Sequence, residues 1–456
     1  MLEGKPKQPK DKNNTGLLSF GQKTGYAMGD FASNLSWQMI KIFLLYFYTD
    51  VYGITPSQGG LIYFISRIWD AANDPVIGYV ADHTKSRWGK FRPYILFGAV
   101  PLGIINVLTF TTPELGPTGK FIYALVTFLL LCTIFTFVTI PFSTLSAVIT
   151  EDTNERSSIA GYRMFCAGLG ILTVSIATQP LVKLFENEQR GFQAVVILYS
   201  IIAAILYFLS FASSREVVTA KKENRYTLKD VFSIISKNRP LLILCAVVFF
   251  TGISITLRQS AGMYFIKYNL GKENLFPVYM AVLISGAYIG IVLSTFLSKK
   301  IGKRNMYITA IAIYIAGDLG VLFTPYSNIV PIFCFLCVAG IGYGGTAQLM
   351  WAMAPDTVEY AEWKTGIRAE GITFSAFSFI LKLETAVGGI LGGVILSSSG
   401  YVANVVQSET SLNAILYMVA LAPIVAGIIG IGFLYFYNLD KVTFSRIIED
   451  LKKRRG

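Results

Sequence analysis

Twelve long, mostly apolar stretches run through this chain, and they restrict its possible folds more than any other feature does. A helix of about 20 apolar residues crosses the ~30 Å hydrocarbon core of a bilayer. With 53% hydrophobic and only 14% charged residues, the 456-residue chain is also too apolar for a soluble domain. The sequence therefore predicts an all-α, polytopic membrane protein, whose twelve transmembrane helices lie near residues 25–50, 58–82, 93–112, 120–148, 158–184, 193–213, 240–268, 275–299, 305–325, 328–354, 371–399 and 410–438.

The longest polar interruption, Ser214–Arg239, divides these stretches into two groups of six. A weak repeat supports this division, because a Gly-Lys pair followed by a Tyr-Ile pair occurs in residues 89–95 and again in residues 302–308. Parallel halves of this kind occur in transporters, with the substrate site near the midplane between them. The predicted organisation is a disordered tail (1–20), an N-terminal half (21–213), a middle loop (214–239), a C-terminal half (240–438) and a basic tail (439–456).

The net charge of +12 arises mainly from short loops and from the two tails. This distribution follows the positive-inside rule and does not indicate nucleic-acid binding. An even number of spans puts both termini on one side, and the basic segments make that side cytoplasmic; these segments are 83–92, 215–239, 299–304 and 452–455. We therefore expect a multi-pass protein of a bacterial-type inner membrane, which functions as a monomer.

Two aspartates lie inside the second apolar stretch. Asp70 and Asp74 are four residues apart, so both carboxylates share one helix face. A charge inside the membrane costs roughly 3 kcal/mol or more unless it faces a partner or a water-filled cavity. The pair therefore predicts a site for a small cation, and oxygen ligands suit Na⁺ while a carboxylate can also carry H⁺. A structural ion pair with Arg67 is the alternative.

Further charges lie within the predicted spans, and their roles stay open at this point: Lys41, Arg258, Asp318 and Glu384. Lys41 shares a helix face with Asp30, Asn34 and Gln38 at helical spacing. A lysine among apolar residues needs a carboxylate partner or a ligand. Direct contact with the substrate and pairing with Asp30, Asp70 or Glu384 are both compatible with the sequence.

Other function classes fit the sequence less well. The only histidine, His83, lies in a basic loop, so no base is available for nucleophilic catalysis inside the membrane. Residues 340–345 match G-x-G-x-x-G, but they lie within an apolar helix and indicate close helix packing. A channel would be expected to show rings of pore-lining residues. The chain is therefore interpreted as a secondary transporter, not an enzyme, that needs no cofactor and is driven by an ion gradient.

Several motifs together resemble the glycoside–pentoside–hexuronide:cation symporters, the melibiose-permease group of the major facilitator superfamily. They are GYAMGD at 25–30, FYTD at 47–50, RIWDAANDP at 67–75, RWGKFRP at 87–93, IPF at 140–142 and DTVEY at 356–360. In the second half, MWA at 350–352, GIRAEG at 366–371 and FSFILK at 377–382 resemble the glucuronide and xyloside branch. The resemblance implies import of a sugar coupled to Na⁺ or H⁺ by alternating access. A lipid carrier of the same fold is the alternative.

The resemblance also implies roles for individual residues. The cation site falls on Asp70, Asn73, Asp74 and Thr136. The substrate positions fall on Asp30, Thr139, Ser143, Arg163 and Lys382. Lys41, Trp69, Arg258 and Trp351 are further substrate candidates, the two tryptophans as platforms for a sugar ring.

Three positions depart from the melibiose pattern. Thr139 replaces an acid, Ser143 replaces a tryptophan, and Gly29 replaces a cation. These departures leave specificity for galactosides open, while Asp30 and Arg163 are retained. Whether the glycoside carries an acidic group, as a hexuronide or a sulfonated sugar does, stays open, because four cationic side chains could reach the predicted central cavity.

Opposite charges at the expected cytoplasmic face suggest a gate. Arg87, Lys90 and Arg92 lie on the same side as Asp356 and Glu359, so the two groups could close that side. A role of the cations in topology alone is the alternative.

Overall fold

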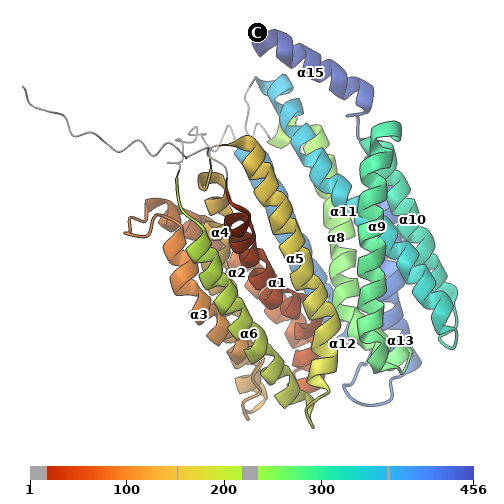
Figure 1. Cartoon of the computed structure of the whole chain (residues 1–456). Coiled ribbons are helices and arrows are strands. Elements are labelled where there is room, and N and C mark those ends of the chain that lie inside the picture. The colour runs from red at the N-terminus through yellow and green to blue at the C-terminus, as the bar shows by residue number, and fades with distance from the viewer. Residues whose placement is uncertain (1–17, 151, 218–234, 367–369, 456) are drawn as a thin grey trace, which may run out of the picture.

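The fold consists of long helices arranged side by side (Figure 1). The computed structural model describes residues 18–150, 152–217, 235–366 and 370–455, and within these ranges every regular element is a helix. The first six long helices are α1 (Phe20–Tyr46, continued by the π-helix η1, Phe47–Val51), α2 (Pro56–His83), α3 (Arg92–Thr109), α4 (Pro117–Val148), α5 (Thr153–Val182) and α6 (Glu188–Ser213). They agree with the first six predicted spans to within a few residues.

The second group repeats this order. Its helices are α8 (Arg239–Tyr264, continued by the π-helix η2, Phe265–Asn269), α9 (Phe276–Ile301, preceded by the 3-10 helix η3, Glu273–Leu275), α10 (Lys303–Phe323), α11 (Ile329–Thr365), α12 (Glu370–Ser398), and a last helix in three parts, α13 (Glu409–Leu416), η4 (Tyr417–Leu421) and α14 (Ala422–Tyr435). Ten helices in the described part of the chain are long and apolar enough to cross a membrane. The other two, α1 and α2, carry the charges discussed below.

The packing of the helices repeats along the chain. In the first half, α1 packs against α5 and α6, α4 packs against α2 and α3, and α3 also packs against α6. In the second half, α8 packs against α12 and α14, α11 packs against α9 and α10, and α10 also packs against α14. Each of these five contacts in the first half therefore has a counterpart six spans later. This repeat gives the molecule two similar bundles, which makes the arrangement an all-α polytopic fold of 6+6 helices.

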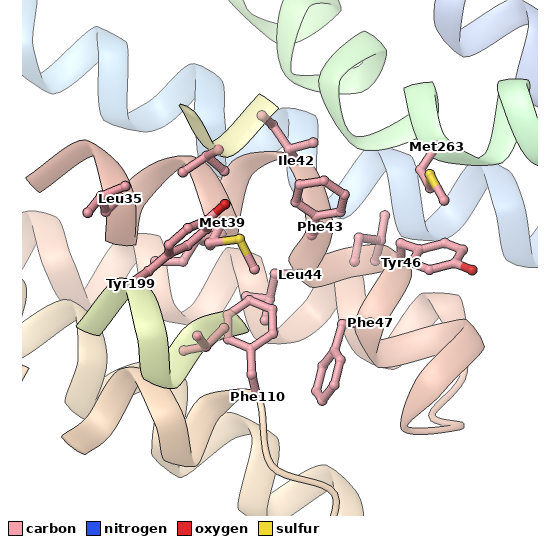
Figure 2. Close-up of a cluster of buried hydrophobic side chains, with 14 of the residues drawn as sticks. Leu35, Met39, Ile42, Phe43, Leu44, Tyr46, Phe47, Phe110, Tyr199 and Met263 are labelled. Carbon is pink, nitrogen blue, oxygen red and sulfur yellow. The ribbon is translucent and has the colours of Figure 1, made fainter. Parts of the chain in front are cut away.

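Three helix pairs join the halves: α1 with α8, α2 with α12, and α5 with α9. We call the end of the bundle that holds η1 and η2 the far end, and the end that holds α15 (Lys441–Arg455) the terminal end (Figure 1). Near the far end, the rings of Phe43 and Phe276 lie 5.4 Å apart between centroids, and those of Tyr46 and Tyr264 lie 5.8 Å apart. Figure 2 shows Phe43 and Tyr46 of α1 in this buried cluster, with Met263 of α8 beside them. Apolar packing therefore joins the two halves at the far end.

Glycines allow α2 and α12 to approach closely. A Cβ atom on Gly393 would lie only 2.3 Å from the carbonyl oxygen of Pro56 and 2.8 Å from the Cα of Gly60. Gly389 makes similar room for the ring of Tyr63. Small residues at a helix crossing in a membrane let the backbones come into contact. We refer to this contact of Pro56 and Gly60 with Gly389 and Gly393 as the glycine crossing.

The ends of the elements differ from the sequence prediction in two places. α11 was expected to end near residue 354 but continues to Thr365, so the acidic segment 356–362 is helical. It ends at Gly366, whose φ of 74° is a left-handed conformation that glycine adopts without strain. The basic tail forms α15, where Asp450 accepts a hydrogen bond from Trp363 Nε1 at 3.3 Å. The predicted N-terminal tail and middle loop lie largely outside the described residues.

Candidate functional site

Helix α2 carries the acid pair and is well defined at its start. Thr55 caps it by accepting a hydrogen bond from the backbone N–H of Gln58, whose side chain in turn accepts from the N–H of Thr55. Pro75 lies inside the helix directly after Asp74 and has no N–H to donate to the carbonyl of Ala71. The helix bond from residue 75 to the Ala71 carbonyl is therefore missing within one turn of both aspartates.

Asp70 is held by side chains from two helices. Thr136 Oγ1 of α4 donates to Asp70 Oδ1 at 2.7 Å, and Arg67 Nη1 donates to Asp70 Oδ2 at 3.3 Å. The Arg67 guanidinium also lies 4.3 Å above the ring of Trp37 and is buried. Asp70 therefore has both the Thr136 hydroxyl that the resemblance implies and the ion pair with Arg67, while a cation site here stays a prediction.

Lys382 of α12 joins the acid pair from the other half of the molecule. Its Nζ lies 3.2 Å from Asp70 Oδ2 and is hydrogen-bonded to Asp74 Oδ2. Asp70 is buried, and Asp74 and Lys382 are half-buried. The ammonium group thus lies between the two carboxylates, which is where a monovalent cation would also be stabilised.

Two polar atoms beside this bridge have no partner. Asn73 Nδ2 and Asp74 Oδ1 are buried without a hydrogen bond in the described part of the chain. Buried polar groups are normally satisfied, so such atoms often mark the place of an ion or water. Two carboxylates, a hydroxyl and an amide provide hard oxygen ligands, which fit Na⁺, and either carboxylate can accept H⁺.

A second ion pair lies between α1 and α5. Arg163 donates to Asp30 in a bidentate geometry, with Nε–Oδ2 and Nη2–Oδ1 distances of 2.7 Å and 3.1 Å. The guanidinium lies 5.0 Å from the ring centre of Phe142 and 5.7 Å from that of Tyr26. Both charged side chains keep about a fifth of their surface exposed. The pair is therefore accessible to a polar ligand while its charges neutralise each other.

The remaining N-terminal candidates are placed less tightly. Thr139 Oγ1 donates to the carbonyl of Phe135 at 2.9 Å within α4, and Ser143 is exposed. Trp69 is half exposed, and its Nε1 donates to Thr133 Oγ1 at 2.9 Å. In the described residues, no hydrogen bond or ring contact joins Trp69 to the Asp30–Arg163 pair. Its predicted role as a sugar platform stays a prediction.

Arg258 lies in a separate environment. It pairs with Asp318 of α10, and its Nε donates to the carbonyl of Val419 at 2.9 Å. Both side chains are buried within the C-terminal half. The structure therefore gives Arg258 a contact that stabilises this half and does not bring it to the acid pair. Trp351 is half exposed and packs edge-on against Phe377 at 5.5 Å.

Lys41 differs from the other intramembrane cations. In the described part of the chain it takes part in no hydrogen bond or ion pair, and the carboxylate that acts on it electrostatically is Glu384 of α12. The predicted pairing with Asp30 or Asp70 is not present, because those groups are bonded to Arg163 and to Lys382.

Among the predicted gate residues, Arg87, Arg92 and Asp356 make contacts within their own halves in the described part of the chain. The backbone N–H groups of Lys90, Phe91 and Arg92 donate to the carboxylate of Glu216 at 2.7–3.1 Å. Arg92 also donates to the carbonyl of Phe211 at 2.8 Å. Arg87 stacks on Trp88 at 4.0 Å. This loop is therefore held at the terminal end by the start of the middle segment.

On the opposite half, Asp356 is bonded to Lys303 at 2.7 Å, and Glu359 follows it one turn later on α11. A direct bond between Arg92 and Asp356 is not formed in this conformation, and a gate made by these groups stays a prediction for another one.

Asp50, to which the sequence alone assigns no role, forms a second polar cluster between the halves. This buried carboxylate in η1 accepts hydrogen bonds from Tyr268 and from Tyr401, the latter at 2.7 Å, and its Oδ1 lies 3.3 Å from Lys267 Nζ. Asn404 Nδ2 also donates to the backbone carbonyl of Asp50 at 2.8 Å. We call these five residues the far-end cluster. The motif at 47–50 was the available signal, although the partners lie more than 200 positions away.

Nearly the whole chain is similar to known transport proteins. Residues 25–441 match the family described as MFS/sugar transport protein. The symporter YnaJ of Bacillus subtilis, itself uncharacterised, is 34% identical over 452 residues, which covers 97% of this chain and 96% of that protein. The isoprimeverose transporter of Lactiplantibacillus pentosus is 32% identical, covering 98% and 95%. The glucuronide carrier protein homolog of Escherichia coli is 31% identical, covering 96% of both chains.

Solved structures of low sequence identity share the architecture. A bacterial homolog of the human lysosomal transporter Spinster, in an inward-facing and occupied conformation, is 14% identical, with a TM-score of 0.65 over 93% of this chain and 97% of that one. At this identity the likeness concerns the fold alone.

Proposed function

The chain belongs to the family of MFS/sugar transport proteins, and from this premise we propose that it imports an uncharged glycoside together with Na⁺ or H⁺. It is a membrane transporter and not an enzyme. The observation that carries the proposal is the Lys382 ammonium, which bridges Asp70 and Asp74 across the two halves. The pair supplies a cation site whose occupation is linked to the contact between α2 and α12.

The bridge suggests how the cation and the halves are coupled. A cation that binds between the carboxylates competes with Lys382, because both need the same oxygens. Displacement of Lys382 breaks a contact between the halves and frees an ammonium group at their boundary. A ligand changes a conformational equilibrium only by binding one state better than the other, and this competition supplies such a difference. Cation and glycoside then raise each other's affinity by the same factor.

The contacts between the halves indicate which side is closed. The far-end cluster and the aromatic contacts of α1 join the halves at the far end. At the terminal end, Lys23 pairs with Glu155 and Lys303 pairs with Asp356, each within one half. With the termini in the cytoplasm, this conformation is closed toward the outside.

The charges in the cavity favour an uncharged substrate. Arg163, Arg258 and Lys382 are each bonded to a carboxylate of the protein. An anionic sugar that bound to Arg163 or Lys382 would have to displace such a carboxylate and leave it without its partner, which is costly. At Lys41, which has no such bond in the described residues, the anion would meet the buried carboxylate of Glu384. A neutral glycoside needs only hydrogen bonds.

The test uses purified protein in proteoliposomes. We expect uphill accumulation of isoprimeverose or another uncharged glycoside under an inward Na⁺ or H⁺ gradient, and faster uptake of these than of glucuronides. Asp74→Asn should abolish accumulation but retain exchange, while Asp440→Asn, which alters an exposed carboxylate before α15, should transport normally. Normal accumulation by Asp74→Asn at equal protein level, or preferential accumulation of glucuronides, would contradict the proposal.

A further inference from the structure

Glu384 is a buried carboxylate with weak partners. Its side chain is nine-tenths buried, and its carboxylate accepts hydrogen bonds from Thr385 Oγ1 at 3.2 Å and from Thr256 Oγ1 at 3.5 Å. Both are longer than the 2.5–3.0 Å of ordinary hydroxyl hydrogen bonds. The other intramembrane carboxylates Asp30, Asp74 and Asp318 are bonded directly to a cation. Glu384 therefore keeps acceptor capacity that the protein does not use.

The backbone of α8 makes room for this carboxylate. A Cβ atom on Gly252 would lie 2.1 Å from Glu384 Oε2, so a larger residue there would displace the carboxylate. Thr256 follows one turn later on the same face of α8. The carboxylate thus lies where α12 and α8 of one half meet.

Lys41 of the N-terminal half lies close enough to Glu384 for the two charges to act on each other. Lys41 and Glu384 interact electrostatically, yet neither forms an ion pair with the other or with any residue in the described ranges. Lys41 belongs to α1 of the N-terminal half and Glu384 to α12 of the C-terminal half. Helix α8, whose Gly252 lies against Glu384, is in contact with α1 across the boundary between the halves. The Lys41 ammonium on one half and the Glu384 carboxylate on the other are therefore available to a ligand between them.

From this arrangement we propose that Glu384, with Thr256 and Lys41, forms a subsite for the hydroxyl groups of the glycoside, with Glu384 as the acceptor that selects which hydroxyl positions are tolerated. Sugar hydroxyls both donate and accept, so one ring can donate to the carboxylate and accept from the ammonium. An anionic ligand would gain from Lys41 but be repelled by Glu384. The proposal rests on the proposed transport of an uncharged glycoside and names residues of its binding site.

The subsite gives the sugar contacts in both halves. Arg163 and Asp30 lie on the N-terminal half, and Glu384 and Thr256 lie on the C-terminal half. A ligand that touches both binds more tightly when the halves close around it, which is the difference in affinity that a change of conformation requires.

Binding of p-nitrophenyl xyloside, galactoside and glucoside, each with its monodeoxy derivatives, tests the subsite. In the unaltered protein, one deoxy derivative should bind roughly 10- to 100-fold more weakly, because it leaves the charged acceptor without its donor. In Glu384→Ala this ratio should fall to about one, while the ratios for other positions persist. Gly252→Ala, which keeps the charge but displaces the carboxylate, should reduce the same ratio.

Folding and cation binding are followed in parallel by thermal unfolding and by cation titration, so that a general loss of structure is recognised. If Glu384→Ala does not fold, Glu384→Gln and Gly252→Ala carry the test. Unchanged deoxy ratios in every folded variant would overturn the subsite while leaving the transport proposal intact. No binding of any glycoside by the unaltered protein would overturn both.

Discussion

Removing the Lys382 ammonium should make the cation bind more tightly. In the structure this group lies 3.2 Å from Asp70 Oδ2 and is bonded to Asp74. Lys382→Ala leaves two carboxylates with Arg67 as their nearest cation, so they should recruit Na⁺ or H⁺ more strongly. A hydrogen bond to a charged group contributes about 1.5–3 kcal/mol, which corresponds to a rise in cation affinity of roughly 10- to 100-fold.

The measurement is a cation titration of purified protein, with Na⁺ at fixed pH and with pH at fixed ionic strength, followed by intrinsic fluorescence or calorimetry. Tighter binding slows release, so accumulation should fall although binding improves. Lys382→Arg keeps the positive charge and should show a much smaller gain. Lys303→Ala removes an ammonium from another carboxylate, Asp356 at 2.7 Å, and should leave cation affinity unchanged. Equal or weaker cation binding by Lys382→Ala would refute the competition.

Three further predictions concern other parts of the fold. Asp50→Asn removes the charge paired with Lys267 in the far-end cluster, so the far end should open more often and apparent substrate affinity from outside should rise about tenfold, measured by binding to right-side-out vesicles. The pKa of Glu155 is lowered from its ordinary value of 4.5 by hydrogen bonds from Lys23 and from a backbone N–H, so its stabilising contribution is present at neutral pH and lost as pH falls through the lowered value. Lys23→Ala should therefore cost thermal stability at pH 7 and progressively less as pH falls below 4.5, measured by unfolding scans. Gly393→Leu should block the glycine crossing and abolish transport with normal membrane insertion, measured by uptake and by expression level.

The sequence was most informative about helices and about the charges inside them. Long apolar runs have few ways to satisfy their backbone in a membrane, so the spans could be located closely. The acid pair at positions 70 and 74 was visible because charge is rare in such runs. The partner of that pair could not be identified from the sequence, since Lys382 is more than 300 residues away and any of several acids could have neutralised this lysine.

The difficulty of identifying the partner of a charge from the sequence also explains why two residues have other surroundings in the structure than expected. Arg258 was a substrate candidate, yet its partner is Asp318 inside the same half. Asp50 had no assigned role, although it joins both halves. A charge in an apolar helix shows that a partner exists, but its identity depends on which helices pack together. That arrangement comes from side-chain packing over the whole molecule.

The glycine crossing lies near one end of α2 and α12, so a rotation about it moves the distant parts of the two helices most. The backbones touch at Gly393, and Lys382 lies eleven residues away along α12, which is about 16 Å at 1.5 Å per residue. A rotation of the helices by about ten degrees about this contact would move Lys382 by about 3 Å, enough to break its bonds to Asp70 and Asp74. The contact itself would hardly shift, because points on the axis of rotation do not move, and Gly393 meets the backbone of Pro56 and Gly60 there. A small rotation of α2 against α12 at one end of the bundle would therefore be enough to make or break the bonds of Lys382 to Asp70 and Asp74.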